Sequence, residues 1–223
     1  MTGRTIAIGD IHGCSMALRS LLQAVDPGSN DLIVTLGDYV NRGPDSRGVL
    51  DQLIDLRRRS RLISILGNHD EMLLRARGGS SDVAQRPAGG LLTRAASEID
   101  RPQIALTEGH FGFLEACDDY FETDDHIFLH ASYDPVLPMN EQPTSLLRWQ
   151  SLRRGIPGRH VSGKTVVAGH TSQKNGKILD LGHLRCIDTY CYGGGWLTAL
   201  DVHSGEVWQV DVRGRARPRR SLR

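Results

Sequence analysis

Five short apolar runs in this chain each lead into a loop that carries an Asp, Asn or His side chain. The runs lie at residues 4–8, 31–36, 61–66, 127–129 and 165–168. Binding residues of α/β proteins collect on loops at the carboxyl ends of strands. We therefore expect the five loops to meet at one place in the fold. The side chains that they carry are Asp10, His12, Asp38, Asn68, His130 and His170.

Helical periodicity follows each of the first three runs. Residues 15–25, 45–59 and 69–77 repeat their apolar side chains with the period of an amphipathic helix. A strand–loop–helix unit that occurs three times predicts a parallel βαβαβ sheet. Because parallel strands end at the same edge of a sheet, the first three loops should lie side by side.

The repeat breaks at residues 78–81, which read Gly-Gly-Ser-Ser. We interpret residues from 78 to about 107 as an insert with one short helix near 91–99, placed over the mouth of the site. A helix is expected at 111–117, and the remaining apolar runs read as strands joined by tight turns. These strands are expected at 127–129, 165–168, 178–187, 197–202 and 207–212.

These elements predict a single α/β domain over residues 1–212, with two packed sheets flanked by helices. The last eleven residues, 213–223, contain six arginines and no acidic residue. Such a tail can bind nucleic acid or an acidic surface. A disordered, solubilising end is the more common case, and it is our expectation here.

The overall charge places limits on the partners. The formal net charge is +1, which argues against binding of nucleic acid or membranes by bulk electrostatics. The first residues show no signal-peptide core, and no apolar run reaches the length of a membrane span. We expect a cytoplasmic protein whose four cysteines are free thiols, since none forms a CxxC pair.

The donor types in the five loops indicate a metal centre. Carboxylate, amide and imidazole donors suit Mn²⁺, Fe or Zn²⁺ better than a metal selected by thiolates. Asp10 and His12 point two donors at one place, and a carboxylate such as that of Asp38 can bridge two ions. Two ions about 3.5–4 Å apart are a general device for displacement at phosphorus. A single Asp or His after a strand is usually a cap or a turn former, but five such loops in order argue against coincidence.

A second motif matches a nucleotide-binding pattern but lies in the wrong structural context. Residues 158–165 fit the pattern GxxxxGK[ST] of a nucleotide-binding P-loop. That motif functions only between a strand and a helix, where the helix N-terminus meets the phosphates. Here Pro157 precedes it and a β-type run follows it, so we interpret it as a turn into a strand.

The ordered loops resemble the signature blocks of a known family. Residues 9–13, 37–43 and 67–70 are similar to the three blocks of the phosphoprotein phosphatases, the calcineurin-like metallophosphoesterases. Residues 130–131 and 169–171 resemble the two later His blocks of that family. The family includes bacterial and bacteriophage-type serine/threonine phosphatases and symmetrical diadenosine tetraphosphate hydrolases. The resemblance implies an α/β/β/α sandwich of two mixed sheets, with a dinuclear metal site on strand-end loops.

The resemblance also implies roles for individual residues. His69 would protonate the leaving alkoxide, while a metal-bridging hydroxide attacks phosphorus directly. Arg42 would grip the phosphate with its planar fork of donors, assisted by Asn68. A second phosphate-binding arginine is usual, for which Arg148 is our choice and Arg153 the rival. The metal ligands would be Asp10 and His12 for the first ion, Asp38 as the bridge, and Asn68, His130 and His170 for the second.

Two positions depart from the family pattern. Asn41 stands where the family has an Asp that orients the catalytic His and stabilises its protonated form. An amide accepts a hydrogen bond from imidazole but brings no charge, so we expect a weaker general acid. Asp70 replaces a Glu, and because the charge is kept we expect only a small effect.

The sequence thus predicts a phosphomonoesterase similar to serine/threonine protein phosphatases, with two divalent ions and Mn²⁺ as the first choice. Its substrate would be a phosphoprotein or a small phosphoester. The first alternative is a symmetrical dinucleoside polyphosphate hydrolase. The second, of another class, is a weakly active metal-binding regulatory module in which Asn41 marks the loss of catalysis.

Overall fold

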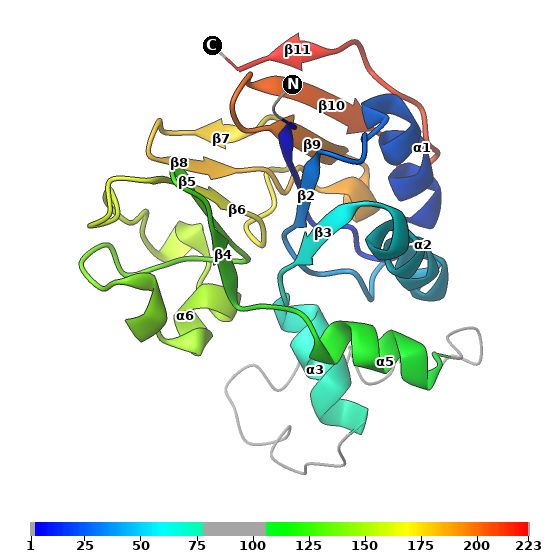
Figure 1. The fold of residues 1–223 in the computed structure, drawn as a ribbon, viewed down its shortest axis with the longest axis horizontal. Coiled ribbons are helices and arrows are strands. Elements are labelled where there is room, and N and C mark those ends of the chain that lie inside the picture. Colours follow the sequence, from blue (N-terminus) through cyan, green and yellow to red (C-terminus); the bar gives the residue numbers. More distant parts are fainter. Residues whose placement is uncertain (1–2, 78–105, 223) are drawn as a thin grey trace.

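The computed structural model describes residues 3–77 and 106–222, and these form two packed β-sheets with helices outside them (Figure 1). The first sheet has the strand order β11-β10-β9-β1-β2-β3, and the second has the order β4-β5-β6-β8-β7. The first sheet consists of β1 (Thr5–Ile8), β2 (Leu32–Thr35), β3 (Arg61–Ser64), β9 (Leu197–Asp201), β10 (Glu206–Val210) and β11 (Arg220–Ser221). The second consists of β4 (Tyr120–Glu122), β5 (His126–Leu129), β6 (Thr165–Ala168), β7 (Leu179–Asp180) and β8 (Leu184–Cys186).

The predicted parallel unit forms half of the first sheet. Strands β1, β2 and β3 pair in parallel, with Thr5 opposite Leu32 and Leu32 opposite Arg61. Strand β9 then pairs antiparallel with β1, and β10 antiparallel with β9. The sheet is therefore mixed, as expected.

The second sheet repeats this arrangement on a smaller scale. Strands β5, β6 and β8 pair in parallel, and β4 and β7 close the two edges antiparallel. The parallel strands of both sheets direct their carboxyl ends to one edge of the molecule. That common edge brings loops from distant parts of the chain together.

The helices form the outer layers. Helices α1 (Ser15–Val25) and α2 (Ser46–Arg59) cover the first sheet, while α6 (Thr144–Trp149) lies on the far side of the second (Figure 1). Helix α3 (Asn68–Arg77) begins at the common edge and packs on α5 (Glu108–Glu115). The described residues also form three 3₁₀ turns, η2 (Met139–Glu141), η3 (Leu152–Arg154) and η4 (Cys191–Gly193).

Three apolar clusters hold the layers together, and strand alternation explains them. On β1, Ile6 and Ile8 face the helices while Ala7 faces the other sheet, because successive side chains of a strand point to opposite faces. Phe128 and Val167 of the second sheet meet Ala7 in the cluster between the sheets. The layer order is α/β/β/α, and the predicted fold class is confirmed.

The expectation for the carboxyl end is not met, and that for the insert is not tested. We expected residues 213–223 to be disordered, but Arg220–Ser221 form β11 and pair antiparallel with β10. Two stacked arginines accompany this pairing, with Arg217 over Trp196 and Arg219 over Trp208. The helix expected near 91–99 and nearly all of the insert lie outside the described residues.

Two further observations bear on the sequence expectations. The P-loop-like motif at 158–165 passes through a turn directly into β6, so it lacks the following helix that phosphate binding needs. Within the described residues, no helix is long and apolar enough to cross a membrane.

Candidate metal centre

Glycines allow the loops of the common edge to approach each other closely. Gly67 precedes Asn68, and a Cβ placed on it would lie 2.2 Å from the backbone nitrogen of Asp38. A Cβ on Gly169, which precedes His170, would lie 2.1 Å from a carboxylate oxygen of Asp10. Neither approach tolerates a side chain. The Gly that precedes a ligand is therefore required by the contact between loops.

Asp38 lies at the centre of the site. Its Oδ2 is 3.3 Å from His12 Nε2, and its Oδ1 is 3.4 Å from His130 Nε2. Its Oδ1 also accepts a hydrogen bond of 2.9 Å from the backbone N–H of His69, at the start of α3. Two trios of donor atoms within 4.8 Å of one another share this carboxylate. They are His12, Asp38 and His69, and Asp38, His130 and His170.

Backbone carbonyls orient two of the histidines. Nδ1 of His12 lies 3.1 Å from the Val40 carbonyl, and Nδ1 of His130 lies 2.7 Å from the Leu36 carbonyl. A carbonyl can only accept, so each Nδ1 carries the proton and each Nε2 keeps a free lone pair. This is the outer-shell arrangement that fixes the tautomer of metal-binding histidines.

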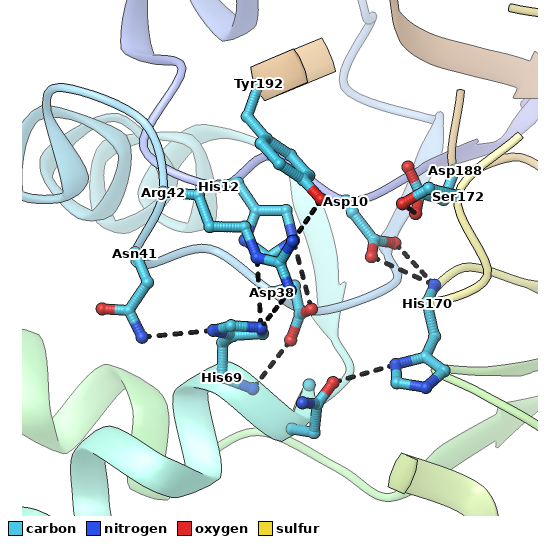
Figure 2. A network of polar contacts seen from close by, with 12 residues as sticks. Asp10, His12, Asp38, Asn41, Arg42, His69, His170, Ser172, Asp188 and Tyr192 are labelled. Atoms are coloured by element: carbon cyan, nitrogen blue, oxygen red, sulfur yellow. Dashed lines mark hydrogen bonds and ion pairs between the residues drawn. The ribbon is translucent and has the colours of Figure 1, made fainter. Parts of the chain in front are cut away.

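The remaining ligand candidates join the loops of the two sheets. Asn68 Oδ1 lies 3.0 Å from His130 Nε2 and 2.9 Å from His170 Nδ1. Both carboxylate oxygens of Asp10 accept from the backbone N–H of His170 at 3.0 Å (Figure 2). All six side chains predicted as metal ligands therefore lie together.

The electrostatics of this cluster favour cations. Burial, reinforced by Asp188 and Asp38, holds the pKa of Asp10 well above its usual range. Burial likewise raises the pKa of Asp38 to about 7. Several carboxylates crowded in a low-dielectric site repel each other unless positive charge is present. This oxygen-rich cluster fits divalent cations.

The histidines complement this charge. Burial lowers the pKa of His130 to about 4 and that of His170 to about 3, and it lowers the pKa of His12 well below its usual range. At neutral pH these rings are neutral, as metal ligation requires. The donor set therefore combines neutral imidazoles with carboxylates and an amide, which suits Mn²⁺, Fe or Zn²⁺.

His69, Asn41 and Arg42 lie beside the cluster. Nε and Nη2 of Arg42 donate to His69 Nε2 at 3.3 and 3.0 Å, and the Asn41 amide lies 3.3 Å from His69 Nδ1 (Figure 2). A guanidinium only donates, so Nε2 accepts and the proton is on Nδ1. The Asn41 atom that faces Nδ1 is Nδ2, which also donates, so a hydrogen bond from the ring requires the amide to turn its oxygen to Nδ1. Burial and then the charge of Arg42 lower the pKa of His69 to about 3.

Asp70, the second departure from the family pattern, braces two of the loops. It is fully buried and accepts from the backbone N–H groups of Tyr39 at 2.9 Å and Gly67 at 3.0 Å. Burial and the charge of Asp38 raise its pKa to about 8. The carboxylate thus ties the loop after β2 to the loop after β3.

The structure separates the two arginines that compete for the second phosphate contact. Arg148, 15% exposed, pairs with Asp119 and has Nη1 3.5 Å from Glu71 Oε1. Its guanidinium connects α6 to α3, and its charge also reaches His130, whose pKa it lowers. Arg153 is exposed, and its Nη2 donates to the Ser172 carbonyl at 2.9 Å, two residues beyond His170. This position favours Arg153, the rival, over Arg148.

Sequence reasoning left two residues of the site, Asp188 and Tyr192, without a role. Asp188 is buried and accepts a hydrogen bond from Ser172 Oγ at 2.6 Å. After burial, the charge of Asp188 is the second largest cause of the raised pKa of Asp10. Asp188 follows β8 as the ligand candidates follow their strands, so the same signal could have found it. Tyr192 contacts Arg42 from η4 and has no comparable signal in the sequence.

Backbone strain is concentrated at this site. Among the described non-glycine residues, positive φ occurs at Asp26 after α1 and otherwise only in the site loops. Sparsely populated conformations of this kind persist where surrounding contacts fix them, and they cluster at functional sites. The six strained residues of the site loops are His12, Asp38, Asn41, Arg42, His170 and Tyr190.

Comparison with known proteins agrees with this geometry. The sequence profile described as calcineurin-like phosphoesterase matches residues 3–176. Serine/threonine-protein phosphatase 1 of Salmonella typhimurium is 32% identical over 87% of this chain and 90% of its own length. A symmetrical bis(5'-nucleosyl)-tetraphosphatase of Janthinobacterium sp. is 34% identical over 96% of this chain and 98% of its own length. A crystal structure of a candidate diadenosine tetraphosphatase superposes with a TM-score of 0.69 at 27% identity, covering 94% of each chain.

Proposed function

The chain belongs to the calcineurin-like phosphoesterase family, and from this premise we propose that it is a dinuclear metal-dependent phosphomonoesterase of the serine/threonine protein phosphatase type. One observation carries the proposal. The two donor trios share Asp38, and His69 and Arg42 lie beside that shared carboxylate. A phosphate bound there would meet a proton donor and a guanidinium together.

The site residues divide into candidate metal ligands and groups that would act on the substrate. When bound, two divalent cations would lower the pKa of water and withdraw charge from the phosphoryl oxygens. We take Mn²⁺ as the first choice, with Fe or Zn²⁺ as alternatives. The side chains that would hold them are Asp10, His12, Asp38, Asn68, His130 and His170.

The reacting groups come from the first sheet. Arg42 would leave its contact with His69 and place its fork of donors on the phosphoryl oxygens, with the Asn68 amide beside it. The Nε2 so released would hold the proton that the leaving alkoxide needs, while Asn41 keeps the ring in place through Nδ1. Arg153 is our second phosphate contact, in preference to Arg148. No Ser or Cys nucleophile is required.

The alternative substrate, a symmetrical dinucleoside polyphosphate, is favoured by the names of two relatives. A phosphoprotein or small phosphoester is supported by the name of the Salmonella relative, whose match extends over most of both chains.

A weakly active regulatory module is the alternative of another class. Its motivation is Asn41, which brings no charge to the ring of His69. Retention of His69, Arg42 and every ligand candidate argues for turnover. A regulatory module would bind metal and phosphate without releasing product.

The test is a substrate panel with Mn²⁺-loaded protein. Phosphate release would be measured from p-nitrophenyl phosphate, a phosphoserine peptide and diadenosine tetraphosphate, with His69→Asn as the inactive comparison. We expect turnover of the two monoesters that is lost in the variant. Cleavage of the dinucleotide alone would establish the nucleotide hydrolase instead. Metal binding without any turnover would establish the regulatory module.

A further inference from the structure

Tyr192 reaches into the site from the loop between β8 and β9. Its phenolic oxygen accepts a hydrogen bond from Arg42 Nη1, and the guanidinium carbon lies 4.7 Å from the centre of its ring (Figure 2). The two residues are 150 positions apart in the chain. Arg42 is thus contacted by one tyrosine in two ways, by a hydrogen bond and by a cation–π contact.

The ring of Tyr192 is itself held firmly. It meets the ring of His12 edge-on at 4.7 Å and that of Tyr190 at 4.8 Å. The residue between the two tyrosines, Cys191, is buried in the core with α1. A side chain with two neighbouring rings in contact has reduced rotamer freedom. Tyr192 is therefore a rigid support within the site.

Arg42 needs such a support because of what it must do. Its side chain is long, its backbone is in the left-handed region at φ 67°, and two of its nitrogens rest on His69. Phosphate recognition depends on the plane of the guanidinium fork. An arginine whose plane is already fixed loses less entropy when it binds an anion.

The hydroxyl of Tyr192 is suited to accept from a cation. Burial raises the pKa of Tyr192, while Arg42 and a side-chain hydrogen bond with Ser172 lower it. Ser172 Oγ in turn donates to Asp188 at 2.6 Å. A continuous polar chain therefore runs from Arg42 through Tyr192 and Ser172 to a buried carboxylate beside Asp10.

We propose that Tyr192 is a positioning residue that presets the Arg42 fork, and that it thereby sets the affinity of the site for a phosphoryl group. The proposal rests on the phosphate-binding role of Arg42 given above. An interaction of this kind acts on bound substrate and transition state alike. Its loss raises KM and leaves kcat nearly unchanged.

The experiment is a double-mutant cycle on Tyr192 and Arg42 in the Mn²⁺-loaded full chain. The variants are Tyr192→Phe, Arg42→Ala and the double variant. The readouts are kcat and KM for p-nitrophenyl phosphate and the Kd of inorganic phosphate by calorimetry. Loss of a hydrogen bond to a charged group predicts that Tyr192→Phe raises KM and Kd about tenfold, with kcat within about twofold. Once Arg42 is alanine, the same change should have an effect of less than about twofold.

A matched control makes the same chemical change elsewhere. Tyr133→Phe removes a phenolic hydroxyl that donates to the Gly158 carbonyl at 2.7 Å, and it should leave KM and the phosphate Kd unchanged. An unchanged Kd in Tyr192→Phe would overturn the proposal. So would an equal loss with and without Arg42, because Tyr192 would then act through the loop. The measurement of the phosphate Kd needs no turnover. A protein that binds phosphate but hydrolyses no substrate would contradict only the proposed function. A protein that binds no phosphate would contradict both the proposed function and the role of Tyr192.

Discussion

The two sheets contribute unequally to one centre. The loops after β1, β2 and β3 of the first sheet carry several site residues each, in segments of three to five residues. Strands β5 and β6 of the second sheet contribute one histidine each, His130 and His170. The first sheet therefore supplies ligands together with the groups proposed to handle the proton and the phosphate. The second sheet completes the shell.

Backbone strain follows the same division. Positive φ occurs at 46° in His12, 52° in Asp38 and 67° in both Asn41 and Arg42, whereas the loops after the second sheet show it at 59° in His170 and 67° in Tyr190. Dense, strained loops place several reactive groups within a short segment. The difference suggests that changes in the first sheet remove chemistry, while changes in the second weaken metal binding.

The largest effect is expected at Asp38, which both sheets contact. Replacement of Asp38 by Asn removes the charge that His12 and His130 approach from opposite sides. We expect turnover to fall by a factor on the order of 10³ and the metal content to drop below two ions per chain. Metal analysis and steady-state kinetics measure this. Asp31→Asn, at a carboxylate paired with Arg4, is the matched control and should keep both values.

The same His→Asn substitution, made once in each sheet, tests the proposed division of roles between the two sheets. His69→Asn in the first sheet should lower kcat by about 10²- to 10⁴-fold while both ions stay bound. His170→Asn in the second should raise the Mn²⁺ concentration for half-maximal activity at least about tenfold, with much of kcat recovered at saturation. A metal titration of activity distinguishes them. If both variants responded to added Mn²⁺ in the same way, the division between the sheets would be wrong.

The two arginines of the 148–154 segment should separate stability from binding. Arg148→Ala leaves the buried Glu71 with fewer partners, and we expect a loss of about 1–3 kcal/mol with KM unchanged. Arg153→Ala should leave the melting temperature unchanged. It should raise KM several-fold, which corresponds to the loss of about one hydrogen bond to the substrate. Thermal unfolding and kinetics on both variants check this. A raised KM in Arg148→Ala alone would restore the sequence-based choice.

The parallel unit and the ligand loops could be predicted because their signals are local. The helix expected at 15–25 is found at Ser15–Val25, and that expected at 45–59 is found at Ser46–Arg59. A glycine, an acid or a histidine directly after an apolar run marks a strand end, and the structure brings these marked residues together. Each such signal spans fewer than ten residues.

The rest depends on contacts between distant residues. β11 exists because the open edge of β10 accepts the tail, and nothing within residues 213–223 encodes that partner. Arg148 could not be distinguished from Arg153 because the distinguishing acids, Glu71 and Asp119, come from other elements. The same holds for Tyr192 and its contact with Arg42.

A smaller gain is expected from restoring charge in the first sheet. Asn41→Asp would place a carboxylate beside the Nδ1 of His69, where the amide now lies at 3.3 Å. We expect a several-fold rise in kcat at alkaline pH that is larger for alkyl phosphates than for p-nitrophenyl phosphate, because poor leaving groups depend more on a general acid. Parallel pH–rate profiles with the two substrates measure it. An unchanged profile would count against the role given to Asn41.

The smallest effect concerns the edge opposite the metal centre. His126 begins β5 and meets His203 edge-on at 5.2 Å, and burial, then the charges of His203 and Arg185, lower its pKa from its ordinary value of 6.5. As the pH falls, His126 is protonated in the unfolded chain before it is protonated in the folded protein. The contribution of neutral His126 to the free energy of unfolding is therefore complete above pH 6.5 and decreases as the pH drops below it. Urea midpoints between pH 7.5 and 5 should decline less in His126→Phe than in the wild type. Equal declines would assign the effect to other groups, and His183→Phe, at a half-buried histidine outside this contact, serves as the control.

The most direct test of a centre shared by the two sheets is a Mn²⁺ titration of the metal-stripped protein that follows binding and p-nitrophenyl phosphate hydrolysis together. We predict that two ions bind per chain and that hydrolysis returns as the second site fills, because Asp38 serves both trios. Full activity with one ion, or hydrolysis that survives a chelator, would contradict the account.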